Sequence, residues 1–199
     1  NTDANECGAI VPFAATDATG IPNSVITYDI QPDTFFEVGT TTITATATNA
    51  VGTAILTFDV TVIDDIKPEI AAPNNISTVA TSAAGVVVNY TTPVGTDNCS
   101  VTTAMTSGLA DGATFPIGTT VVTYVATDGS GNDASASFNV EVVGIAPVIV
   151  VPANITVNTD ANECGAIVPF AATDATGIPN SVITYDIQPD TFFEVGTTT

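Results

Sequence analysis

Carboxylates and cysteines are the side chains through which this sequence could do chemistry. The chain has 199 residues with twenty-one Asp and Glu, three Cys, a single Lys, no Arg and no His. General acid–base catalysis would therefore fall to carboxylates. They are scattered over turn-like segments, with Asp111 apart from the others, and no stretch suggests a cleft holding two paired acids. The sequence predicts turn residues in contact with water, and no enzyme.

The charge balance excludes further classes of function. A net charge of −20 would repel nucleic acid and anionic membrane surfaces. Mean hydropathy is +0.41, whereas disorder needs low hydrophobicity together with high charge. No apolar run approaches the roughly eighteen residues of a membrane span, so we expect a folded segment without membrane insertion.

The chain repeats itself at two levels. The forty-two residues Asn1–Thr42 return unchanged at Asn158–Thr199, an offset of 157 residues (158 − 1). Within that period, "FEVGTTTITATATNAVGT" at Phe36 resembles "FPIGTTVVTYVATDGSGN" at Phe115. Such periods indicate an array of modules, here called A and B. We expect part of A at 1–65, a complete B at 66–144 and part of the next A at 145–199.

The hydrophobic pattern has the period of strands. Thr120–Asp128 and Ala134–Val143 alternate apolar with small polar residues around "DGSGND", which predicts a hairpin. Pro68–Thr78, Gly85–Pro93 and Ser100–Gly108 are further expected strands, and signals for helices are nearly absent. We therefore predict an all-β chain of tandem immunoglobulin-like antiparallel β-sandwiches. The short linkers "DDIKP" and "VGIAP" predict modules stacked end to end as a rod.

The motifs "PNNIS", "GVVVNYTTP", "TDNCS", "ATFPIGTTVVTYVATDGSGN" and "ASASFNVEV" resemble the hyalin repeat, an immunoglobulin-like module of extracellular adhesion proteins. The likeness covers nearly all of B, and A departs from it at Glu37 and at "TNAVGT". Long acidic, Thr-rich arrays of this module resemble giant surface adhesins of gliding and biofilm-forming Bacteroidota. The resemblance implies a secreted, cell-surface filament that acts in adhesion, biofilm formation or gliding motility, with neighbouring repeats as its partners.

A binding module is the alternative to a structural stalk. Repeats that each contact a polysaccharide or a solid surface would gain avidity from the same duplication. Such a module would need an aromatic platform, but the chain has no Trp. Phe115, Tyr124, Phe138 and Tyr90 fall at positions expected to face the core. The stalk is therefore favoured.

One joint between modules is rich in oxygen ligands. In the expected sandwich, the loop "GTDNCS" and the hairpin "TDGSGND" face the incoming linker, whereas the other joint, "VVGIAPVI", contains no acid. Carboxylate and amide oxygens in this density suit Ca²⁺, although Asp and Asn also form turns without a metal. The candidate calcium ligands are Asp64, Asp65, Asp97, Asn98, Asp128, Asn132 and Asp133.

The cysteines predict a disulfide between modules. Alignment of A with B sets Cys7 and its copy Cys164 against Ala84, and Cys99 against Thr176. The two cysteine positions flank one strand, about 20 Å apart, which is too far for pairing inside a module. At a head-to-tail joint they would face each other. We therefore expect a disulfide between Cys7 and Cys99, and a partner for Cys164 beyond Thr199.

Overall fold

The structure is a computed structural model that describes residues 1–14, 18–196 and 198. All of the regular secondary structure in these ranges is β-strand, which confirms the predicted all-β class. The described ranges therefore contain no apolar helix that could span a membrane. Contacts divide the chain into two compact units: the first comprises 1–73, 92–107 and 123–137, and the second 74–91, 108–122 and 138–199. The module boundaries and the stacking as a rod stay predictions.

Fifteen strands are described along the chain, and most of them are short. Their bounds are β1 Gly8–Val11, β2 Val25–Tyr28, β3 Thr34–Glu37, β4 Gly39–Thr48, β5 Thr53–Val62, β6 Ile76–Val79, β7 Val86–Val87, β8 Val101–Ser107, β9 Thr114–Phe115, β10 Gly118–Asp128, β11 Asp133–Val143, β12 Ile145–Val150, β13 Gly165–Val168, β14 Thr173–Ile178 and β15 Thr191–Glu194.

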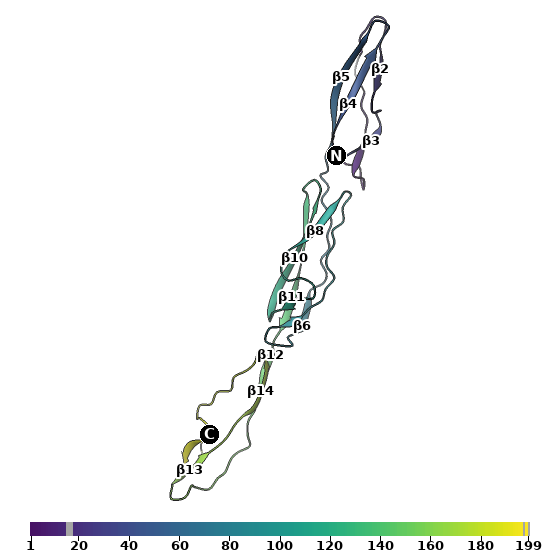
Figure 1. Cartoon of the computed structure of the whole chain (residues 1–199). Coiled ribbons are helices and arrows are strands. Elements are labelled where there is room, and N and C mark those ends of the chain that lie inside the picture. Colours follow the sequence, from purple (N-terminus) through teal and green to yellow (C-terminus); the bar gives the residue numbers. More distant parts are fainter. Residues whose placement is uncertain (15–17, 197, 199) are drawn as a thin grey trace. The chain divides into compact units, whose positions relative to one another are not determined.

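In the first unit, the segment before Ile63 forms two small sheets. β2, β4 and β5 make an antiparallel sheet, and β1 pairs antiparallel with β3 (Figure 1). Thr residues alternate along β4 and bond across to β5, as in the pair Thr40 and Thr61, whose Oγ1 atoms lie 3.0 Å apart. The residues between these threonines face inward. The resulting core consists of Ala9, Phe36, Ile43, Val60 and Val62, with Phe13 packed against it.

In the second unit, a similar core lies between two sheets. β6, β11 and β10 are neighbours in one sheet and β7 pairs with β9 in the other. Phe115, Val122 and Val140 are fully buried. The ring of Tyr90 meets those of Phe115 and Phe138 edge to face. β6 is parallel to β11, in contrast to the antiparallel pairs elsewhere. The core positions expected for these aromatic residues are thus confirmed.

Two expected strands are much shorter than predicted. In Gly85–Pro93, only β7 is regular, because the backbone N–H of Tyr90 bonds to the Asp111 carboxylate and leaves the ladder. In Pro68–Thr78, regular pairing begins only at Ile76, after an isolated bridge from Glu69. Pro residues in this stretch lack the donor that a ladder requires.

The second unit also holds the repeated segment Asn158–Thr199. β13 pairs with β15, and β12 pairs with β14 (Figure 1). A groove lies between 152–158 and the β13–β15 pair, and its apolar lining includes Ala166, Val168, Phe170 and Phe193.

Candidate functional site

The loop that carries Cys7 is built by local hydrogen bonds. Asp3 N–H donates to Gly8 O at 2.7 Å, and the Asp3 carboxylate accepts from Ile10 N–H at 2.9 Å. Asn5 takes a left-handed conformation with φ of 64°, which Asn tolerates better than most residues. Gly8 follows, where a Cβ would collide with the ring of Phe35 and the backbone of Phe36. The loop therefore ends tightly against β3 and leaves the Cys7 side chain at its tip.

Cys7 and Cys99 form a disulfide within the first unit. Their Sγ atoms lie 2.13 Å apart and their Cα atoms 4.7 Å apart, across 92 residues of sequence. The structure thus joins the two cysteines that were expected to face each other at a head-to-tail joint. Cys164 is a free, exposed thiol.

Two side-chain amides strengthen the same joint. Asn98 donates from Nδ2 to the Glu6 carbonyl at 2.9 Å, beside the disulfide. Asn132 donates from Nδ2 to the Asp64 carbonyl at 3.1 Å. The disulfide and one hydrogen bond therefore join the two cysteine loops, and the second hydrogen bond joins the 128–133 hairpin to the segment after β5. The contribution of Glu6 comes from its backbone, which explains why side-chain patterns missed it.

Two carboxylates meet next to the disulfide. Oxygens of Asp64 and Asp97 lie within 4.8 Å of each other and of the Cys99 sulfur. Asp64, which directly follows β5 and Ile63, is 4% exposed; its Oδ1 accepts from Ile66 N–H, whereas its Oδ2 has no partner. Asp97 accepts from Cys99 N–H through Oδ2, and its buried Oδ1 has no partner.

Two other buried side-chain oxygens of the first unit also lack partners. Oδ1 of Asn98 is one, and Oγ1 of Thr2 is another. Thr2 is placed by its backbone N–H, which donates to Ile63 O at 3.1 Å, next to Asp64. Sequence reasoning missed Thr2, because only the pairing of its backbone with the end of β5 brings it to this place.

The remaining calcium candidates do not join the pair. Asp128 accepts from Ser130 N–H, and from both the N–H and the side-chain amide of Asn132, at 2.8–2.9 Å. Its oxygens serve as turn acceptors. Asp65 is exposed and accepts from the Asn1 side chain, and Asp133 is exposed at the start of β11. Among the described residues, the structure therefore brings together the carboxylates of Asp64 and Asp97, and Asn98 adjoins Asp97 in the chain. Asn132 reaches the Asp64 carbonyl and not the carboxylate pair, and the three remaining acids stay outside it.

Hydrogen bonds within the 128–133 hairpin set the pKa of the Asp128 carboxyl group. Burial of this carboxyl group raises its pKa, but hydrogen bonds from the Asn132 side chain and from the backbone of Asn132, Ser130 and Gly131 outweigh burial. The net pKa lies below the ordinary value, so the group stays ionised at neutral pH.

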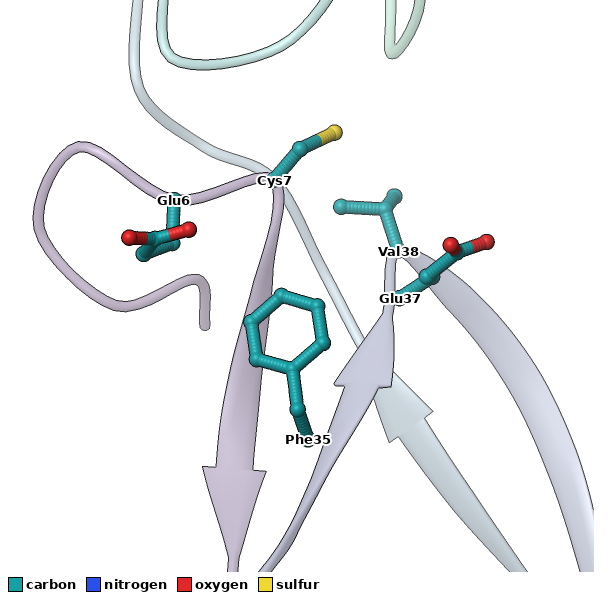
Figure 2. A pocket seen from close by; sticks show the side chains of 5 residues that line it. All are labelled: Glu6, Cys7, Phe35, Glu37 and Val38. Carbon is teal, nitrogen blue, oxygen red and sulfur yellow. The ribbon is translucent and has the colours of Figure 1, made fainter.

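A shallow hollow beside Cys7 is lined by Glu6, Cys7, Phe35, Glu37 and Val38 (Figure 2). The Cys7 side chain points away from the Phe35 ring in this view. Phe35 is 48% exposed. One exposed ring between two acidic residues is a small surface, and it does not form an aromatic platform.

The central part of the chain is similar to a known domain family, and most of the chain is similar to two known proteins. Residues 63–142 match the HYR domain family. The chain is 36% identical over 181 residues to hyalin of Strongylocentrotus purpuratus and 35% identical over 206 residues to hyalin of Lytechinus variegatus. These alignments cover 84% and 96% of this chain but 15% and 39% of the two hyalins.

Solved structures offer a more distant likeness. The extracellular domain of protocadherin gamma B4 is matched at a TM-score of 0.34 with 16% identity, over 81% of this chain and 33% of that one. The assignment rests on the sequence comparisons and on the observed strands. Residues 63–142 of the chain are therefore similar to hyalin-repeat (HYR) modules, and the chain spans less than half the length of the hyalins that it matches.

Proposed function

We propose that this chain is a repeat unit of an extracellular surface filament that acts in adhesion, and that its modules are structural and non-catalytic. The supporting observation is the repetition itself: forty-two residues return unchanged after a full period. A stalk becomes longer each time an identical unit is added, and it needs no new binding or catalytic site in that unit. The finer assignment, to the gliding or biofilm adhesins of Bacteroidota, rests on the resemblance alone.

The disulfide fits this role. Cys7–Cys99 fixes a joint whose other bonds in the loops are two side-chain amide contacts. Disulfides persist in oxidising, extracellular surroundings, and a covalent link resists tension that a small interface would not.

The length of purified arrays tests the proposal. Proteins with one, two and four 157-residue periods would be compared by small-angle scattering and electron microscopy. A stacked array gives a maximum dimension that grows in equal steps with each period. Compact particles, whose dimension grows roughly as the cube root of mass, would contradict the stalk.

The alternative is a module that binds polysaccharides or solid surfaces through each repeat. The exposed Phe35 between Glu6 and Glu37 is the observation in its favour (Figure 2). A single period and a four-period array would be screened against polysaccharides and mineral surfaces, with Phe35→Ala as the variant. Binding by a single period that Phe35→Ala abolishes would replace the stalk by the binding module. A spacer binds nothing in either form.

A further inference from the structure

Asp64 carries a buried carboxyl group with one oxygen that lacks a hydrogen-bond partner. Asp64 is 96% removed from water, yet its Oδ2 atom has no hydrogen-bond partner. The Oδ1 atom of Asp97 is also buried without a partner, although the residue as a whole is half-buried. Burial of an ionised carboxylate without a partner is strongly unfavourable, so such groups in stable proteins are paired with a cation or a donor.

The protein offers no cation for this purpose. Its only basic side chain is Lys67, which is exposed and forms no ion pair with either carboxylate in the described structure. The Cys99 sulfur lies within the same 4.8 Å, but it belongs to the disulfide and cannot act as a thiolate ligand. No basic side chain therefore balances the charge of this pair.

The spacing fits an ion held between the two carboxylates. Ca²⁺ binds oxygen at about 2.3–2.6 Å, so two ligands of one ion lie at most about 5 Å apart. Ligand oxygens of Asp64 and Asp97 lie within 4.8 Å. A neutral amide oxygen, Asn98 Oδ1, adjoins them in the chain and is also buried without a partner.

We propose that Asp64, Asp97 and Asn98 bind one divalent cation of the Ca²⁺ class beside the Cys7–Cys99 disulfide. Thr2 Oγ1 is a candidate fourth ligand, and water completes the six to eight oxygens that Ca²⁺ takes. The ion joins the end of β5 to the loop that carries Cys99 and so stiffens the joint. This assignment does not depend on the adhesive role and stands or falls by direct metal binding.

Calorimetric titration of the full chain with CaCl₂ tests the site, in 150 mM NaCl to screen diffuse binding. The expected result is one saturable ion per chain, with a dissociation constant on the order of 0.1–1 mM, as in other extracellular modules. Thermal unfolding followed by circular dichroism should shift upward in Ca²⁺ and return in chelator, since an ion that binds only the folded state stabilises it. A parallel titration with MgCl₂ should show weaker binding.

Asp97→Asn is the decisive variant. It keeps the acceptor for Cys99 N–H and removes one charge, and it should weaken Ca²⁺ binding tenfold or more. Asp133→Asn is the matched control, because it makes the same change in net charge at an exposed acid outside the pair and should bind as the parent does. Asp64→Asn should also lose Ca²⁺ binding. If Asp64→Asn does not fold, the result for Asp97→Asn alone tests the site.

Three outcomes would overturn the proposal. These are no saturable binding at 10 mM CaCl₂, unchanged binding in Asp97→Asn, and equal loss in Asp97→Asn and Asp133→Asn. The last would indicate general attraction of cations to a chain of net charge −20. None of these outcomes bears on the repeat-length test, so failure of the metal site is distinguishable from failure of the stalk.

Discussion

Two identical sequences, Asn1–Thr42 and Asn158–Thr199, fold with different neighbours in this chain. The first copy runs into β4, which begins inside it at Gly39, and then into β5, whereas the second is preceded by β12. Their paired strands agree in register: Gly8 faces Glu37 in β1–β3, and Gly165 faces Glu194 in β13–β15. Their outer strands differ. Val25–Tyr28 pairs with β4, whereas residues 182–185 form no strand.

The difference is what we expect if each copy holds only part of the strands of a predicted A module. Beside the first copy, Leu56 and Phe58 alternate along β5 with the same period as the buried Val60 and Val62 but are 77% and 37% exposed. Before the second copy, the apolar segment 145–157 is exposed, and a groove takes the place of the core that the first copy forms with β4 and β5. Because residue 158 repeats residue 1, an array places a 145–157 segment before every copy of Asn1. We infer that this segment covers the exposed end of β5.

The largest expected effect comes from completing the first copy. A protein with residues 145–157 fused directly before Asn1 should bury Leu56 and Phe58. Burial of their exposed parts contributes about 2–3 kcal/mol to the free energy of unfolding, and the apolar side chains of the added segment add to it. Urea denaturation would measure it. The control carries the same fusion with its residues equivalent to Ile155 and Val157 replaced by Ser. Equal stability of fusion and control would refute the inference.

The next effect compares equivalent phenylalanines. Phe138 is 3% exposed on β11, and Phe58 holds the matching place on β5. Phe138→Ala should cost about 3–5 kcal/mol. Phe58→Ala should cost less than half as much, because its ring contacts Phe13 but is partly solvated. In the fused protein the two costs should converge, and a persistent gap in denaturation midpoints would argue against a shared architecture.

The cysteines provide a third comparison. Cys99→Ser removes the disulfide that closes a 92-residue separation and should lower the free energy of unfolding by about 2–4 kcal/mol. Cys164→Ser, at an exposed free thiol, should change it little. Mass spectrometry of a two-period array under non-reducing conditions should also find Cys164 bonded to the next copy of Cys99. Free thiols at Cys7 and Cys99 would contradict both expectations.

The smallest effect concerns acid. The backbone N–H of Thr44 donates to Asp29 at 2.8 Å, and this bond together with a weaker one from Ile30 N–H outweighs desolvation and lowers the pKa of this carboxyl below its ordinary 3.8. The folded chain therefore gains stability from Asp29 above about pH 3.8 and loses it as pH falls through the lowered pKa. Asp29→Asn should reduce the drop in urea midpoint between pH 6 and pH 3. Asp186→Asn, at the same place in the second copy, is the control, and an equal change there would refute the role of Thr44.

Some features of the site follow from local sequence. The cysteine loop recurs in both copies with the same bonds: Asp160 accepts from Ile167 N–H as Asp3 accepts from Ile10 N–H. Asn162 matches the left-handed Asn5. Turn residues and alternating Thr predicted the strands around these loops, because short-range hydrogen bonds and side-chain periodicity depend on near neighbours.

By itself, then, the sequence determined the all-β class, the repeat and the hairpins, since each is encoded within a few residues. Tertiary structure alone decided which strands persist: 25–28 is a strand only where β4 supplies its ladder. It also decided which acids meet. Asp128 and Asp97 are both turn residues in sequence. The Asn132 side chain donates a hydrogen bond to the Asp128 carboxylate, whereas the carboxylate of Asp97 lies within 4.8 Å of the buried Asp64 carboxylate. The two carboxylates differ because of long-range strand pairing and exclusion of water, and neither can be predicted from the residues adjacent to them in sequence.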